Sequence, residues 1–427
     1  MESVDLAIVA AFVIGYGLVS GRLSRTVVTG PMVFVVFGLL VGSEGLDVVD
    51  LSLENTFVET FATITLVIVL FSDAARIDLR ILRRNAAVPA RLLGIGMPLT
   101  IAGGLAAAVV LFDGLNVWEA ALVAAVLAPT DAALGHAVVT SGRVPVRIRQ
   151  ALNVESGLND GIAVPFVAIF IAGAAAAGGL GTTGFWTEFA AKQIGFGLLA
   201  GVGIGVVSGL LIQYATATRW MNHTFQQLAV LAVPLFSFAV AEQIDGNGFI
   251  AAFAAGIAIG NVTRRVCHGL FEFVEDEGQL LVLLTFMIFG AVFVGPALGH
   301  LTWQIALYAV LSLTVVRMVP VAVSMIGMRF QVDTVAFLGW FGPRGLASIV
   351  FGLVVLESSV VERGEIFIIV TWTVLLSVVV HGLSARSSVD WYGARAEAMA
   401  DEPDMPEMET VEELPTRFRR KYKKGPD

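Results

Sequence analysis

The sequence contains few charged residues and a single cysteine. Asp, Glu, Lys and Arg together make up 14% of its 427 residues, whereas soluble globular proteins contain about 25%. This shortage excludes the two or three soluble domains that the length alone would allow, and it excludes a disordered chain and a nucleic-acid-binding protein as well. Because Cys267 is the only cysteine, no intramolecular disulfide can form, and a disulfide-stabilised scaffold is excluded.

The sequence also lacks the short motifs of common membrane-associated enzymes. It contains no GxSxG, HExxH or P-loop pattern, which argues against a membrane hydrolase or an ATPase. We therefore expect neither an enzymatic activity nor a cofactor.

Long hydrophobic runs are abundant. Hydrophobic residues make up 57% of the chain, which is enough for about a dozen membrane helices of about 20 residues each. Apolar runs alternate with short polar loops along the chain, and this pattern predicts an all-helical, polytopic membrane protein. The thirteen predicted spans are 5–20, 28–43, 56–73, 91–112, 117–139, 151–174, 193–215, 226–242, 248–262, 279–297, 302–327, 334–356 and 365–383.

The positions of Lys and Arg predict how the chain is oriented. With these spans, 22 of the 26 basic residues lie on one side of the membrane, and only Lys192 and Arg363 lie on the other. Because cytoplasmic loops are enriched in basic residues, we expect the N-terminus outside and the C-terminus in the cytoplasm, in an inner or plasma membrane. Arg91, the first residue of the fourth span, is counted with the loop before it, and Arg317 and Arg344 are the two basic residues in the interior of spans.

The composition changes abruptly near residue 384. An acidic stretch that contains proline is followed by a basic run at 417–424. We expect this tail to be disordered and its basic run to favour contact with anionic lipid head groups. The sequence thus predicts a transmembrane domain at 1–383 and a cytoplasmic tail at 384–427.

Glycine and proline positions indicate an internal repeat with an offset of seven spans. The second span carries Gly30, Gly38 and Gly42, and the ninth carries Gly248, Gly256 and Gly260 with the same spacing. Interruptions at 128–131 in the fifth span and at 342–345 in the twelfth are also seven spans apart. An odd offset inverts the second copy, and inverted repeats with interrupted spans are typical of secondary transporters.

The sixth span carries the densest polar cluster within the apolar regions. Charged groups near the bilayer centre are costly and therefore mark function. On a helix, Glu155 and Asn159 are four residues apart, as are Ser156 and Asp160, so the two pairs lie on one face. Their carboxylate, hydroxyl and amide oxygens suit a small alkali cation better than a soft metal. We expect Asp160 to hold either a proton or a cation.

The interruption in the fifth span is expected to supply further ligands. Pro129 removes a helix hydrogen bond, so backbone carbonyls near Thr130 are free to bind a cation. Asp131 is expected to compensate the N-terminal end of a half-helix.

The interruption in the twelfth span places Arg344 inside the membrane. A lone buried arginine needs a carboxylate partner, and the sequence predicts that this partner is Glu155. We expect Arg317, in the eleventh span, to form a structural ion pair.

These motifs resemble those of the NhaP/NHE-type cation–proton antiporters, a branch of the monovalent cation–proton antiporter superfamily. The most specific features are APTD at 128–131 and ESGLND at 155–160; FSDAARIDL at 71–79, GFIAAFAAGIAIGN at 248–261 and GPRGLAS at 342–348 support them. The resemblance covers about residues 5–383. It implies a homodimer and a thirteen-helix fold with two inverted six-helix repeats, whose interrupted helices cross near the midplane. It also implies a dimerisation part from spans 1–3 and 8–10 and a core part from spans 4–6 and 11–13.

The resemblance also implies roles for individual residues. Asp160 would bind cation and proton in turn, and Ser156 and the backbone at Thr130 would help to hold sodium. Glu155 would be a second carboxylate at this site, the partner of Asp160. Asn159 precedes Asp160 where the electrogenic branch has a second aspartate, so the resemblance implies electroneutral exchange.

We therefore expect a secondary antiporter that exchanges sodium, or lithium, for protons and so serves pH homeostasis. A potassium–proton antiporter on the same fold stays open. A cation channel or a non-transporting membrane sensor is the alternative from another class.

Overall fold

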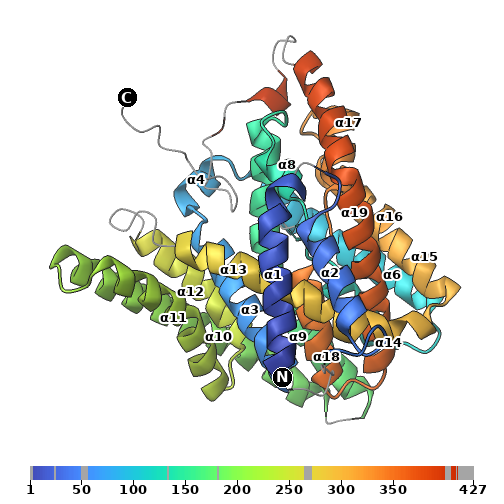
Figure 1. Cartoon of the computed structure of the whole chain (residues 1–427), viewed down its shortest axis with the longest axis horizontal. Coiled ribbons are helices and arrows are strands. Elements are labelled where there is room, and N and C mark those ends of the chain that lie inside the picture. The colour runs from blue at the N-terminus through green and yellow to red at the C-terminus, as the bar shows by residue number, and fades with distance from the viewer. Residues whose placement is uncertain are drawn as a thin grey trace.

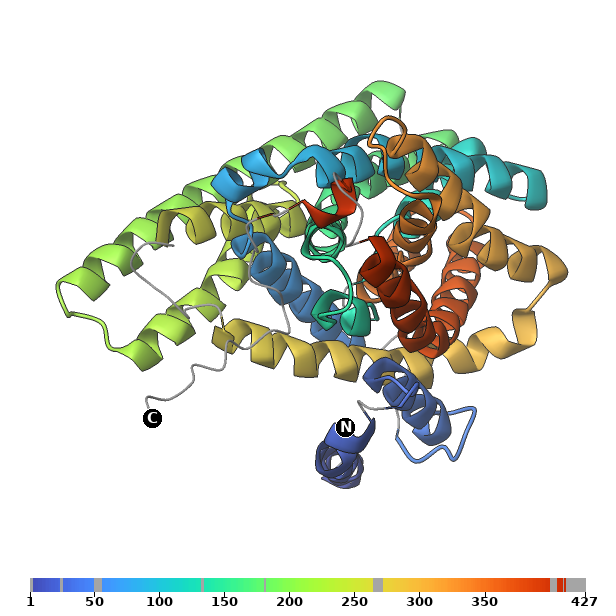
Figure 2. The same ribbon diagram turned by 90° about the horizontal axis from the view of Figure 1, so that it is seen from above.

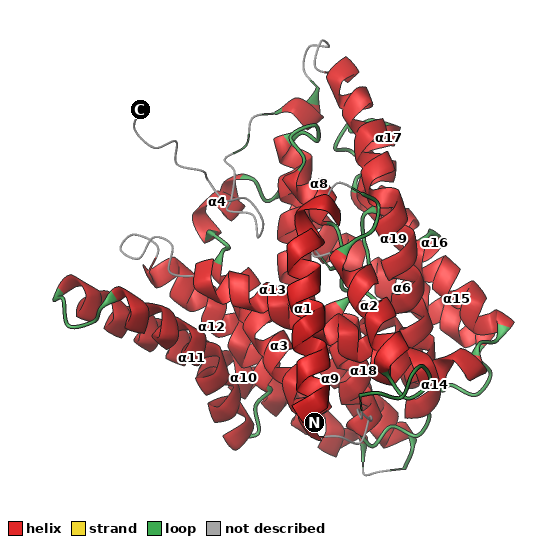
Figure 3. Cartoon of the chain, in the orientation of Figure 1, coloured by secondary structure: helices red, strands yellow, loops and turns green. Residues whose placement is uncertain are grey.

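The described part of the chain is helical throughout its regular secondary structure (Figure 3). The structure is a computed structural model, and it describes residues 3–23, 26–49, 56–131, 134–179, 182–263, 272–399, 405–409 and 411. The predicted all-helical class is confirmed. Cys267 and the basic run at 417–424 lie outside the described residues.

Each predicted span is occupied by one helix or by consecutive helical segments. In chain order they are α1 (Ser3–Leu23), α2 (Gly30–Val41), α3 (Thr56–Ala75), α4 (Leu79–Arg84), α5 (Ala87–Arg91), the π-helical turn η1 (Leu92–Gly96), α6 (Met97–Leu111), α7 (Val117–Val126), α8 (His136–Thr140), α9 (Val146–Ala177), α10 (Thr183–Ala217), α11 (His223–Gln243), α12 (Gly248–Thr263), α13 (Glu272–Ile288), the π-helical segment η2 (Phe289–Val294), α14 (Gly295–Ala297), η3 (Leu298–His300), α15 (Trp303–Leu313), α16 (Val315–Ser324), α17 (Val332–Trp340), α18 (Leu346–Glu357), α19 (Arg363–Met399) and η4 (Pro406–Met408). Within the described residues, nine helical stretches are long and apolar enough to cross a membrane, and α2, α7, α12 and α18 are shorter apolar helices.

Two spans are interrupted, as the sequence predicts, and their breaks meet. Helix α7 ends at Val126, and the extended residues that follow it lie against the segment between α17 and α18. The N–H of Asp131 donates to the carbonyl oxygen of Pro343 at 2.7 Å. A side chain at Gly345 would collide with the Asp131 carboxylate, so glycine permits this close approach. The two breaks therefore form one backbone crossing inside the bundle.

The repeated glycines pack helix backbones together in two equivalent places. In α2, a Cβ atom on Gly38 would collide with the carbonyl oxygen of Met287, and one on Gly42 would collide with that of Ala291. In α12, Gly256 and Gly260 meet the carbonyls of residues 71 and 75 of α3 in the same way. Small residues let membrane helices approach closely. In each repeat, the helix that carries these glycines packs on a helix of the other repeat.

Helix α1 lies at the edge of the molecule beside α2 (Figure 2). Its Phe12 ring stacks on Phe37 of α2, with 3.6 Å between ring centroids. The opposite face of α1 exposes Leu6, Ile14 and Leu18. An exposed apolar face of this kind suits lipid or another membrane helix.

The loops rich in arginine gather at one end of the molecule. Figure 1 shows α4, α8 and the C-terminal part of α19 at the edge opposite the N-terminus of α1. We refer to this edge as the tail end. It carries Arg80, Arg83 and Arg84 in and around α4 and Arg143 before α9.

Helix α19 extends into the predicted tail. It runs to Met399, so the expectation that the chain is disordered from residue 384 is wrong for residues 384–399. Ala385, Val389, Tyr392 and Ala396 recur at helical spacing and are all buried. This apolar stripe packs the extension on the bundle, although charged residues between these positions disguise it in the composition.

A short segment around Glu407 packs on the tail end. The Glu407 carboxylate is fully buried and accepts hydrogen bonds from the N–H of Gln331 at 2.7 Å and the hydroxyl of Thr334 at 3.0 Å. Glu409 forms an ion pair with Arg147 at the start of α9, at 2.5 Å. This part of the tail therefore joins α9 to the beginning of α17.

Candidate functional site

The first wall of the site is the extended segment after α7. Asn116 and Glu119 form a capping box that fixes the start of α7. The helix ends near Pro129, because proline cannot donate to the preceding turn and disfavours a helical conformation in the residue before it. Thr130 follows and is 4% exposed, so its carbonyl and hydroxyl oxygens lie inside the bundle.

Helix α9 provides the second wall, and two hydrogen bonds join it to the first. The Ser156 hydroxyl donates to the carbonyl oxygen of Thr130 at 2.6 Å, and the Asn159 amide donates to the Thr130 hydroxyl at 2.6 Å. The amide oxygen of Asn159 is buried and accepts no hydrogen bond from the described residues. Asp160 follows on the same helix and is 8% exposed. The structure thus brings Thr130, Ser156 and Asn159 together, and Asp160 is the next residue of α9.

Glu155 forms a buried ion pair with Arg317 of α16. Two guanidinium nitrogens of Arg317 lie 2.6 and 2.8 Å from the two carboxylate oxygens, and both side chains are 2% exposed. The predicted pairing of Glu155 with Arg344 is therefore wrong. The prediction that Arg317 forms an ion pair is confirmed. Room for its guanidinium comes from Gly342, where a side chain would collide with Arg317.

Arg344 instead binds backbone carbonyls, two of which belong to the first break and one to α15. Its side chain is fully buried and donates to the carbonyl oxygens of Ala128 at 3.1 Å, Pro129 at 3.4 Å and Ser312 at 3.4 Å. The carbonyls that the break releases carry partial negative charge, and they replace the carboxylate that the sequence reasoning required. Arg344 thus ties the second break to the first.

Asp131 lies at the N-terminus of a half-helix, as expected, but the half-helix belongs to the other break. Its carboxylate accepts a hydrogen bond from the N–H of Leu346, the first residue of α18, at 2.9 Å. A carboxylate at this position stabilises the positive end of the helix dipole.

Sequence reasoning missed Ser348, which also holds the crossing together. Its hydroxyl donates to the carbonyl oxygen of Val126, the last residue of α7, at 2.8 Å. Serine in an apolar span is an ambiguous signal, because most such hydroxyls donate to a carbonyl of their own helix.

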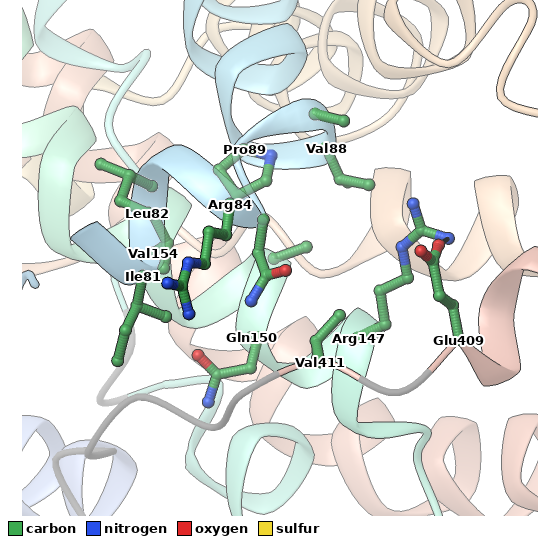
Figure 4. A pocket seen from close by; sticks show the side chains of 13 residues that line it. Ile81, Leu82, Arg84, Val88, Pro89, Arg147, Gln150, Val154, Glu409 and Val411 are labelled. Atoms are coloured by element: carbon green, nitrogen blue, oxygen red, sulfur yellow. Dashed lines mark ion pairs between the residues drawn. The ribbon is translucent and has the colours of Figure 1, made fainter. Parts of the chain in front are cut away.

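A cavity of about 170 Å³ opens beside α9 at the tail end (Figure 4). One face of α9 lines it with Arg147, Gln150, Ala151 and Val154, and α4 and α5 form the opposite wall. The tail completes the lining with Glu409 and Val411. The tail therefore contacts the same helix that carries Asp160, about two turns before the polar cluster.

Comparison with known proteins identifies relatives of the whole membrane part. The family model described as "Sodium/hydrogen exchanger, transmembrane" matches residues 8–391. The K(+)/H(+) antiporter NhaP of Alkalimonas amylolytica is 28% identical over 403 residues, which are 92% of this chain and 67% of that protein. The Na(+)/H(+) antiporter ApNhaP of Aphanothece halophytica is 28% identical over 385 residues, 85% of this chain and 69% of that protein. The chain thus spans about two thirds of the length of these two relatives.

A solved structure shares the fold. The sodium proton antiporter MjNhaP1 from Methanocaldococcus jannaschii superposes with a TM-score of 0.75 at 17% identity. The match covers 90% of this chain and 100% of that one. At this identity the likeness concerns the fold alone.

Proposed function

This chain belongs to the sodium/hydrogen exchanger family of membrane-embedded cation–proton antiporters, and we propose that it exchanges sodium, or lithium, for protons. The observation that carries the proposal is the oxygen-lined site in which Thr130, Ser156 and Asn159 meet beside Asp160. Oxygen ligands of this kind suit a small alkali cation.

We assign the competition between cation and proton to Asp160. Glu155 is already neutralised by its ion pair with Arg317, and the Asp131 carboxylate accepts a hydrogen bond from the N-terminus of α18. Asp160 on α9 is the remaining carboxylate of the cluster that the sequence identified. The buried amide oxygen of Asn159 and the oxygens of Ser156 and Thr130 complete the proposed ligand set for the dehydrated ion.

The exchange cycle follows from the cost of moving charge across the bilayer. A bare carboxylate is expensive to carry through the membrane, so the crossing must occur with Asp160 either protonated or bound to a cation. Asn159 is a neutral amide and adds no second titratable charge. We therefore propose electroneutral exchange of one cation for one proton.

The motion that we propose is movement of a core part against a more rigid scaffold. The glycine contacts of α2 and α12 hold the scaffold helices backbone to backbone, and the crossing of the two breaks lies in the other part. We propose that a second copy of the chain packs on the scaffold through the apolar face of α1, and that the tail end faces the cytoplasm.

A potassium–proton antiporter is the second candidate. The relatives include a protein named as a potassium antiporter and another named as a sodium antiporter, and both substrates bind oxygen ligands. The choice between the two cations rests on transport measurements.

The test is a pH-jump assay in sealed vesicles with sodium, lithium and potassium in turn. We expect wild-type protein to dissipate the proton gradient when sodium or lithium is added, and Asp160→Asn to abolish this flux while remaining folded. Asp390→Asn, an exposed carboxylate in α19, is the matched control. Undiminished exchange by Asp160→Asn would refute the site. Currents without proton coupling would instead support a channel, and exchange driven by potassium alone would support the second candidate.

A further inference from the structure

Two polar residues of α19 hold the ends of the second break. His381 and Ser377 lie one turn apart, and both are fully buried. The Nε2 atom of His381 lies 3.0 Å from the carbonyl oxygen of Trp340, the last residue of α17. The N–H of Arg344 donates to the Ser377 hydroxyl oxygen at 2.7 Å. One helix thus contacts a carbonyl on one side of the break, which also accepts the N–H of Gly342, and binds an N–H on the other side.

The imidazole of His381 connects Ser377 with Trp340. A carbonyl oxygen can only accept, so Nε2 carries the hydrogen that faces Trp340. The Nδ1 atom lies 3.2 Å from the Ser377 hydroxyl and 3.1 Å from the backbone carbonyl oxygen of the same residue. Contacts therefore run from the Arg344 N–H through Ser377 and His381 to Trp340.

The second break is in turn bonded to the first. The Arg344 side chain donates to the carbonyls of Ala128 and Pro129, the two residues directly before Thr130. Thr130 then bonds Ser156 and Asn159 on α9. A shift of the Arg344 backbone would therefore move the carbonyls that set the position of Thr130.

We propose that Ser377 and His381 are positioning residues that set the cation affinity of the site, acting through Arg344 and the paired breaks. This inference rests on the proposed function, because it concerns the affinity of the same site. Neither residue contacts the ion. Replacing either side chain would allow the Arg344 backbone to shift. The shift would displace the oxygens of Thr130 from the positions that bind the cation.

The test measures the half-saturating sodium concentration and the maximal rate for variants reconstituted in vesicles. We expect Ser377→Ala and His381→Leu to raise the half-saturating concentration about fivefold, which corresponds to about 1 kcal/mol of binding free energy, with a maximal rate per folded protein within about twofold of wild type. Ser377→Thr keeps the hydroxyl and is expected to restore the wild-type value. Ser377→Ala is the decisive variant if His381→Leu does not fold, because it removes a single oxygen atom.

Ser384→Ala is the matched control. Ser384 lies on the same face of α19 and accepts a hydrogen bond from the indole nitrogen of Trp340 at 3.0 Å. This hydrogen bond involves the Trp340 side chain and no backbone group of the second break. We expect its sodium dependence to be unchanged. An unchanged half-saturating concentration in Ser377→Ala, or an equal rise in Ser384→Ala, would overturn the proposal. Failure of the proposed function is distinguished by wild-type protein that shows no more exchange than Asp160→Asn.

Discussion

Replacing Arg317 with methionine removes the cation that lies against the buried Glu155 carboxylate. Methionine keeps much of the length of the arginine side chain without its charge. Both members of the pair are 2% exposed, and two nitrogen–oxygen contacts of 2.6 and 2.8 Å join them. The variant would therefore leave a carboxylate inside the protein with its main partner lost.

The expected cost is large because burial prevents water from replacing the guanidinium. Removal of one partner from a buried ion pair costs about 3–5 kcal/mol, whereas removal of both charges together is often close to neutral. We expect Arg317→Met to lose about this much free energy of unfolding. The double variant Glu155→Gln with Arg317→Met is expected to recover most of the loss, because the amide carries no net charge.

Lys192→Met provides the matched control. Lys192 pairs with Glu188 one turn away on α10, and the two side chains are 50% and 66% exposed. An exposed pair of this type contributes little to stability, because water and salt screen the two charges. The free energies of unfolding can be measured by titrating the purified protein in mixed micelles with sodium dodecyl sulfate and following helicity by circular dichroism.

Two results would refute this reasoning. The first is unfolding of Arg317→Met at the same detergent fraction as Lys192→Met, which would mean that the buried pair adds nothing. The second is rescue of Arg344→Met, and not of Arg317→Met, by Glu155→Gln. That result would restore the pairing predicted from the sequence and contradict the geometry of α16.

Two further perturbations probe the scaffold and the tail. Gly38→Val places a branched side chain against the carbonyl of Met287; we expect it to abolish folded protein, measured as the monodisperse fraction in size-exclusion chromatography, and a wild-type yield would contradict the backbone contact. Glu407→Ala removes the acceptor of the Gln331 N–H and the Thr334 hydroxyl; we expect a loss of about 1–3 kcal/mol in the same detergent titration, with a smaller loss for Glu409→Gln, whose side chain is 63% exposed. Equal effects of the two tail variants would contradict the burial of Glu407.

The spans and the breaks were predictable because their signals are local. Each membrane helix needs its own apolar run, and Pro129 and Pro343, each directly followed by a polar residue, mark the two breaks. The cluster on α9 was predictable for the same reason, since Ser156 and Asp160 share a face of one helix. Thr130 was included in the predicted site because the neighbouring Pro129 frees backbone carbonyls near it.

The partners of the two buried arginines were not predictable in this way. Arg317 and Arg344 both lie in spans, and local sequence gives each an equal need for a carboxylate. The choice depends on how α16 and the second break pack against α9, which is a tertiary property. The alternative for Arg344, the freed carbonyls of Ala128 and Pro129, becomes visible only once the two breaks are known to meet.

The exchange of glycine contacts between the repeats also constrains the order of folding. Gly38 and Gly42 of α2 pack on Met287 and Ala291, which are synthesised more than two hundred residues later. Likewise, α3 can complete its packing only after Gly256 of α12 has been synthesised. The first half of the chain therefore cannot complete its packing before most of the second half has been inserted. The two halves of the chain are therefore interlocked through their glycine contacts, and they are not a pair of independently folded units.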